Sequence, residues 1–154
     1  MGVTRVAYEA EGWGVGELWL DGDVVVWHEL PRPATRLQGN RVAHPYVKLV
    51  QRYLAGAKVD LARVPLDLEY ETPFLERCAH ALRAVPRGET VTYGELAALA
   101  GSPGAARAAG SFCARNRLGL FVPCHRVVSA GGLGSYGSHG LAYKKRLLEL
   151  EGAL

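Results

Sequence analysis

The chain has 154 residues, of which 49% are hydrophobic and 21% are charged, and its formal net charge is +3. This balance is typical of a soluble globular protein that forms one compact domain or two small lobes. The apolar runs are too short to span a bilayer, and the N-terminus lacks the basic-then-apolar pattern of a secretion signal. We therefore expect a cytoplasmic protein without a membrane partner.

The first part of the chain predicts a small lobe of three strands and one helix. Alternating apolar residues indicate the strands, and Asp21-Gly22 between the last two is a strong hairpin signal. A polar, proline-containing loop and then apolar residues at helical spacing follow. The strands are expected over Val3–Ala10, Gly14–Leu20 and Val24–Glu29, the loop over Pro31–Arg41, the helix over His44–Leu54 and an extended exit over Leu61–Leu68.

Beyond a boundary near Glu69–Glu71, the pattern becomes helical. Thr72-Pro73 is an N-cap followed by proline at the first helical position. The helix that it opens carries Cys78 on its apolar face, so we interpret this cysteine as a core residue.

A pair of short helices is predicted next. Thr92 and Glu95 have the spacing of a capping box, and a glycine closes the helix that they open. Ser102-Pro103 is expected to cap a second helix, from Gly104 to about Arg115. Two short helices across a tight glycine turn are typical of a helix-turn-helix. The second helix has almost no side-chain bulk, so it can approach another surface closely.

A thiol and an imidazole stand side by side in the run Val122-Pro123-Cys124-His125-Arg126-Val127. Only the thiolate is a competent sulfur nucleophile, and a neighbouring histidine with exclusion of water is one way to form it. An isolated Cys-His pair is also compatible with a buried core cysteine. Three cysteines fit no paired disulfide framework and indicate a reducing compartment. No cysteine or histidine pair has zinc-ligand spacing, so we expect no metal and no cofactor.

Several ordered motifs surround this pair: Pro86–Ala97, Ala105–Gly110, Arg115-Asn116, Val128–Gly140 and a helical Leu141–Glu151. From about Pro65 to Gly152 the chain resembles the O6-alkylguanine-DNA alkyltransferases, the methylated-DNA–protein-cysteine S-methyltransferases. We expect an α/β (α+β) fold, with a three-stranded antiparallel sheet and a helix in an N-terminal lobe (residues 1–70). A mainly helical C-terminal lobe with a helix-turn-helix (residues 71–154) would bind DNA and accept the alkyl group.

The resemblance implies a DNA repair enzyme that moves an alkyl group from guanine O6 to its own cysteine, Cys124, in one irreversible turnover. His125 would remove the Cys124 proton through water, and Glu151 would orient His125. Asn116 would brace the active-site turn through main-chain hydrogen bonds. Whether O4-alkylthymine is also repaired stays open.

The resemblance also assigns residues to DNA. The helix-turn-helix would dock in the minor groove, where small side chains allow close approach; these are Ala105, Ala106 and Gly110. Arg107 would enter the duplex and replace the flipped base. Tyr93 would crowd the 3′ phosphate of the target nucleotide and promote its rotation.

The flipped base would enter a pocket beside the reactive cysteine. Tyr136 would donate a hydrogen bond to the leaving purine, and Ser138 would reach O6. Backbone groups near Cys124 and Val127 would read the guanine amine, and Arg126 would support the same region. Compared with some relatives of the family, the Val128–Gly140 loop has one residue fewer before Tyr136 and one residue more after it.

The implied partner is double-stranded DNA that contains O6-alkylguanine, bound by a monomer in the cytoplasm and nucleoid. Residues 76–154 hold 10 basic and 5 acidic side chains, which favours a phosphate-binding face there through Arg87, Arg115 or Arg117. Three alternatives stay open: a lesion binder that transfers nothing, a cysteine hydrolase with a Cys–His–Glu triad, and a transcriptional regulator. The acceptor Cys124 argues against the first, and the small-residue helix argues against the last.

Overall fold

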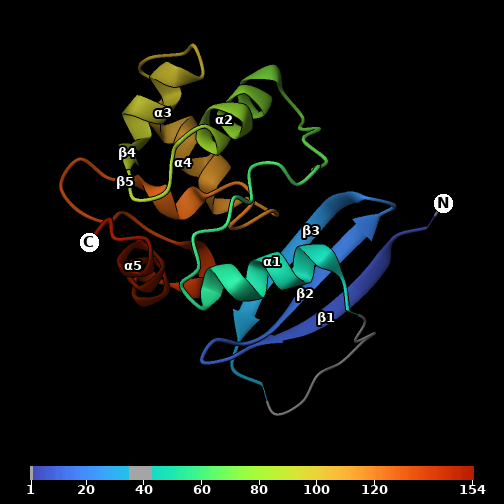
Figure 1. The fold of residues 1–154 in the computed structure, drawn as a ribbon. Coiled ribbons are helices and arrows are strands. Elements are labelled where there is room, and N and C mark those ends of the chain that lie inside the picture. The colour runs from blue at the N-terminus through green and yellow to red at the C-terminus, as the bar shows by residue number, and fades with distance from the viewer. Residues whose placement is uncertain (1, 35–42) are drawn as a thin grey trace. The chain divides into compact units, whose positions relative to one another are not determined.

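The computed structural model describes residues 2–34 and 43–154, and its contacts divide the chain into two units (Figure 1). The first unit consists of Met1–Asp67 with Arg117–Phe121, and the second of Leu68–Asn116 with Val122–Leu154. We expected a single boundary near residue 70. The structure differs from this prediction, because the short segment Arg117–Phe121 returns to the first unit. Backbone pairing explains it, because the His28 amide donates to the Arg117 carbonyl at 2.8 Å.

Three antiparallel strands form the sheet of the first unit, as the alternating pattern predicts. They are β1 (Thr4–Ala10), β2 (Gly14–Asp21) and β3 (Val24–Arg32), in the order β1-β2-β3. Gly22 turns the chain between β2 and β3 with a φ of +61°, which costs glycine no Cβ clash. β3 takes the first two residues of the expected loop, and most of that loop, residues 35–42, lies outside the described residues.

The predicted helix of this unit is confirmed as α1 (Pro45–Leu54), which lies alongside the sheet (Figure 1). His44 caps it, because its ring accepts a hydrogen bond from the Tyr46 amide at 3.1 Å. The apolar face buries Val47 and Val50.

The exit from this unit is not the extended segment expected over Leu61–Leu68. A turn comes first, in which the Val64 amide donates to the Leu61 carbonyl at 3.3 Å. Only Leu66 then pairs with a strand, in a single parallel bridge to Val25 of β3. The apolar composition fitted a strand, but one bridge is all the pairing that the segment finds.

The second unit is mainly helical, and its elements run in chain order as follows: α2 (Pro73–Arg83), β4 (Val91–Thr92), α3 (Tyr93–Leu99), α4 (Ala106–Ala114), the 3₁₀ turn η1 (Cys124–Arg126), β5 (Val127–Val128), the 3₁₀ turn η2 (Gly137–His139) and α5 (Leu141–Leu150). Thr72 caps α2, and Cys78 on its inner face is fully buried, as expected. The capping box of α3 is also confirmed: the Thr92 hydroxyl accepts from the Glu95 amide, and the Glu95 carboxylate accepts from the Thr92 amide. The mixed α/β fold class is therefore confirmed.

The second helix of the pair begins later than predicted. α4 starts at Ala106, two residues after the expected Gly104, and its N-cap Ala105 makes no side-chain hydrogen bond. Gly104 has a φ of +95°, which excludes it from a right-handed helix. Ser102-Pro103 therefore belongs to the turn between α3 and α4 rather than to a helix cap. α3 and α4 pack against each other and against α2 (Figure 1).

A two-stranded parallel sheet places the start of α3 beside the cysteine motif. Val91 pairs with Val127, and Thr92 with Val128. Because α3 begins directly after Thr92, this pairing sets Tyr93 next to the segment that follows Cys124. The register could not be expected from two-residue strands, which carry no periodic signal.

Candidate active site

Cys124 opens a short 3₁₀ turn that is buried in the second unit. The residue is 4% exposed, and its amide donates to the Val122 carbonyl at 2.8 Å. The turn closes when the Arg126 amide donates to the Pro123 carbonyl at 2.9 Å. Val127 then leaves the turn as β5. The thiol is thus held on a backbone that both flanking elements fix.

Asn116, which follows the C-terminus of α4, is hydrogen-bonded to this turn. Its side-chain amide donates to the Val122 carbonyl at 2.8 Å and to Cys124 Sγ at 3.1 Å. A donor aimed at sulfur stabilises the thiolate more than the thiol. The structure therefore brings Asn116 and Cys124 together at hydrogen-bond distance.

The pKa of Cys124 lies well above its usual value. Burial is the main cause, and the side chain of Cys113 adds to it, whereas Asn116 and the ammonium of Lys144 lower the pKa. Burial therefore favours the protonated form of the thiol. A reaction at this sulfur needs a base that takes its proton.

The candidates for such a base and its partner are His125 and Glu151. His125 Nε2 lies 2.8 Å from Glu151 Oε2, and both side chains are almost completely buried. Burial lowers the pKa of His125 against the opposing effect of Glu151, which favours the neutral imidazole, the form that can accept a proton. Since Glu151 occupies Nε2, Nδ1 is the ring nitrogen that can act on the Cys124 proton through water.

Arg126 completes the surroundings of Glu151. Its Nε donates to Oε1 at 2.9 Å and its Nη2 to Oε2 at 2.8 Å, which is a bidentate pair. Its Nη1 donates to the Val85 carbonyl at 2.7 Å. These contacts tie the guanidinium to Glu151 and to the Val85 carbonyl, and the supporting role that we expected for Arg126 stays a prediction.

Most of the residues predicted to touch DNA lie on α3, on α4 or directly before it, and in the loop before α5, whereas Arg126 and Val127 belong to η1 and β5. Gly110 of α4 faces the ring of Tyr93, since a Cβ there would lie 3.8 Å from the Tyr93 ring. Arg107 is exposed on the same helix, and among the described residues we find no hydrogen bond or ion pair to its guanidinium. Ala105 and Ala106 are half-buried.

The loop between β5 and α5 is held by aromatic contacts. The half-buried ring of Tyr136 lies 6.1 Å from that of Tyr143 and 6.0 Å from that of His139. Ser138 is exposed in η2. The structure places Tyr136 and Ser138 on one loop, but their predicted contacts to a purine stay predictions.

Two of the arginines expected to bind phosphate have structural partners instead. Arg87 donates to the Leu150 carbonyl at 3.1 Å. Arg117 belongs to the first unit, where it donates to the Asp67 carbonyl at 2.9 Å. Arg115, at the end of α4, is exposed and fits a phosphate contact better.

Two residues near the thiol were missed in the sequence analysis. Cys113 of α4 raises the pKa of Cys124, and Lys144 of α5 is fully buried. Lys144 stands three residues before Leu147 and four before Leu148, both of which are buried. The position of a lysine among the apolar residues of one helix face could have indicated that Lys144 is buried, whereas no sequence pattern points to Cys113.

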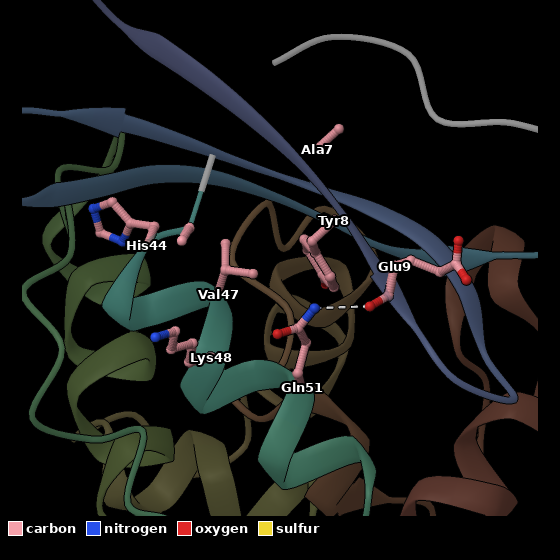
Figure 2. Close-up of a pocket in the computed structure, with 8 residues that line it drawn as sticks. Ala7, Tyr8, Glu9, His44, Val47, Lys48 and Gln51 are labelled. Carbon is pink, nitrogen blue, oxygen red and sulfur yellow. Dashed lines mark hydrogen bonds between the residues drawn. The ribbon is translucent and has the colours of Figure 1, made fainter. Parts of the chain in front are cut away.

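Elsewhere in the described part of the chain, no group of three or more His, Cys, Asp or Glu side chains is arranged to hold a metal ion. A pocket lies between β1 and α1 of the first unit (Figure 2). Figure 2 shows Lys48 and Gln51 of α1 on one side and Glu9 of β1 on the other, with the Gln51 amide donating to the Glu9 carbonyl. None of its lining residues is among the predicted site residues.

No described helix has the length and hydropathy needed to cross a membrane.

The fold and this site define a class of protein with a buried thiol and a buried His–Glu pair. Both belong to the unit that contains the two short packed helices α3 and α4. The family model described as the DNA-binding domain of 6-O-methylguanine DNA methyltransferase matches residues 73–153. The chain is 41% identical over 117 residues to the methylated-DNA–protein-cysteine methyltransferase of Methanopyrus kandleri, which is 76% of this chain and 86% of that protein. It is 47% identical over 106 residues to the Mycobacterium leprae protein of the same name, covering 68% of this chain and 62% of the relative.

A comparison with solved structures supports the same family. The crystal structure described as Mycobacterium tuberculosis OGT in complex with DNA superposes with a TM-score of 0.82 and 34% identity, over 97% of this chain and 93% of that one. The chain therefore belongs to the O6-methylguanine DNA methyltransferase family, the methylated-DNA–protein-cysteine methyltransferases.

Proposed function

We propose that this chain repairs double-stranded DNA by transferring the alkyl group of O6-alkylguanine to Cys124. The observation that carries the proposal is the hydrogen-bonded set around the thiol: Asn116 to Cys124 and Glu151 to His125. It lies inside the region that the family model matches. The names of the relatives support the same activity.

The transfer is a displacement at the alkyl carbon. The S–C bond to Cys124 forms while the bond between that carbon and guanine O6 breaks, and the electron pair stays on the guanine. The thiol proton passes to His125 through water, and the leaving guanine gains a proton or a hydrogen bond, for which Tyr136 is the donor that we propose. The product is a thioether, which water does not readily cleave. Each molecule would therefore act once.

We propose that the target base is flipped from the minor groove by α4. The target oxygen lies inside a base pair, so the nucleotide must leave the stack at a cost of a few kcal/mol. The small residues of α4 permit close approach to DNA, and Arg107 stands exposed among them. Its planar guanidinium can stack and hydrogen-bond in the vacated position.

We expect Arg107→Ala to slow transfer from duplex DNA by about tenfold or more, on the basis of the unstacking energy that the arginine would offset. Transfer from the free alkylated base should be nearly unchanged, because that base has no stack to leave. Single-turnover rates on both substrates measure the difference. Equal slowing of the two would place the role of Arg107 elsewhere.

The decisive test of the function is the intact mass of the protein after incubation with an O6-methylguanine duplex. We expect a stoichiometric gain of one methyl group, mapped to the peptide that contains Cys124. A lesion binder would gain no mass, and a hydrolase would release product repeatedly without a stable adduct. We further propose that the protein acts as a monomer in the cytoplasm.

A further inference from the structure

A lysine is buried next to the reactive turn, and the proposed mechanism of alkyl transfer does not use it. Lys144 of α5 has no exposed surface. Lysine is almost never fully buried unless its charge is paired, because removing an ammonium from water is costly. The contacts of Lys144 should therefore show what offsets that cost.

The Lys144 ammonium joins three separate segments of the second unit. Its Nζ donates to the Val127 carbonyl at 2.5 Å and to the Ser135 carbonyl at 3.1 Å. It also lies 5.8 Å from the centre of the Tyr93 ring, within cation–π range. An ammonium has three donors, of which the two carbonyls accept two, and the ring adds an electrostatic contact.

The same contacts fix the loop that leads to Tyr136. The Ser135 amide donates to the Tyr93 hydroxyl at 3.3 Å, so Ser135 is held through its N–H by Tyr93 and through its C=O by Lys144. The approach is close, since a Cβ at Gly134 would lie 2.6 Å from the Tyr93 hydroxyl. Lys144 thus ties this loop to Val127, three residues after the reactive cysteine.

The charge of Lys144 also acts on the reacting groups. It lowers the pKa of the Cys124 thiol, as Asn116 does, whereas burial and Cys113 raise it. It also lowers the pKa of His125, which Glu151 raises and Arg126 lowers. Burial in turn lowers the pKa of Lys144, and both thiols oppose that shift.

We propose that Lys144 is a positioning residue that ties the Ser135 loop to the reactive turn and provides the buried cation that stabilises the Cys124 thiolate. Its importance for alkyl transfer rests on the proposed function. The tether and the charge are properties of the chain without DNA. They can be measured whether or not transfer occurs.

The test compares Lys144→Met, Lys144→Gln and the control Lys145→Met. Methionine is an unbranched side chain one atom shorter than lysine, without donors or charge, whereas glutamine keeps an N–H donor without charge. Lys145 is the exposed neighbour on the same helix, so its replacement removes one positive charge outside the core. The rate of Cys124 alkylation by iodoacetamide is measured against pH without DNA, with the modified peptide identified by mass spectrometry.

We expect both Lys144 variants to raise the pH midpoint of Cys124 alkylation by about one unit, because the thiolate loses a nearby cation. Below the midpoint this is about a tenfold slower reaction at any given pH. Lys145→Met should leave the midpoint unchanged. Amide hydrogen exchange in residues 129–136 should speed up more in Lys144→Met than in Lys144→Gln, which retains a donor for the loop.

An unchanged midpoint in a folded Lys144 variant would overturn the thiolate role, and unchanged exchange in Lys144→Met would overturn the tether. If the methionine variant does not fold, Lys144→Gln alone decides the charge effect, and its exchange is compared directly with that of the unmodified chain. If the Lys144 variants show the expected rise in the pH midpoint of Cys124 alkylation but the unmodified chain transfers no alkyl group, the proposed function is refuted and the role of Lys144 is not. The two failures are therefore distinguishable.

Discussion

Replacing Cys124 with serine is expected to abolish alkyl transfer while DNA binding remains largely intact. An alkoxide is far harder to form than a thiolate, and the neutral His125 that we assign as base cannot make it at neutral pH. The substitution removes no charge and nearly preserves the shape of the turn that Asn116 braces. Transfer is followed with a labelled methyl group on an oligonucleotide duplex, and binding is measured on the same duplex.

Cys78→Ala is the matched control for this experiment. Cys78 lies on the buried face of α2, and burial raises its pKa to about 11, so it is almost wholly protonated at neutral pH. We expect the transfer rate of this variant to be nearly unchanged. Full transfer by the Cys124→Ser protein, or loss of transfer in the Cys78→Ala protein, would contradict the assignment of the nucleophile.

Local sequence patterns predicted the elements of the fold well, because each had a cause within a few residues. The capping box of Thr92 and Glu95 and the N-cap of Thr72 both formed as expected. The start of α4 was wrong because glycine was read as a helix former: Gly104 adopts a φ of +95° instead. A glycine's left-handed conformation is decided by the turn around it, which the residue type alone does not reveal.

The site was harder to predict than the fold, because its contacts join residues far apart in the chain. The pair of His125 and Glu151 could be expected only through the family resemblance, since 26 positions separate them. The return of Arg117–Phe121 to the first unit depends on backbone pairing with β3, for which five residues offer no periodic signal. Lys144 was missed because a charged residue on a helix is ordinarily exposed.

Replacing Glu151 with glutamine is expected to lower both alkyl transfer and stability. The carboxylate accepts from His125 Nε2 and from two nitrogens of Arg126, and its side chain has no exposed surface. An amide offers one acceptor oxygen and turns its NH₂ toward one of these donors. Breaking a buried ion pair by removing one charge typically costs about 3 kcal/mol or more, because the remaining charge is left uncompensated. We therefore expect a lower melting temperature.

The loss of transfer should exceed what reduced stability alone would cause. In the proposed mechanism His125 takes the Cys124 proton, and without the Glu151 carboxylate the resulting imidazolium would no longer be stabilised. General-base assistance typically contributes 10²–10⁴-fold, so we expect transfer to slow by about 10²-fold. Single-turnover rates are measured at a temperature where circular dichroism shows the variant to be folded, which separates catalysis from unfolding.

Glu149→Gln provides the matched control, because Glu149 is exposed two residues earlier near the end of α5. Its replacement changes the net charge by the same amount, and it should leave both the melting temperature and the transfer rate nearly unchanged. A Glu151→Gln protein that melts early but transfers at the normal rate would reduce Glu151 to a structural partner of Arg126. The proton of Cys124 would then have to leave without help from the His125–Glu151 pair, although the two side chains lie 2.8 Å apart and are buried. Loss of transfer in the folded variant would instead tie the buried pair directly to the chemistry at the thiol.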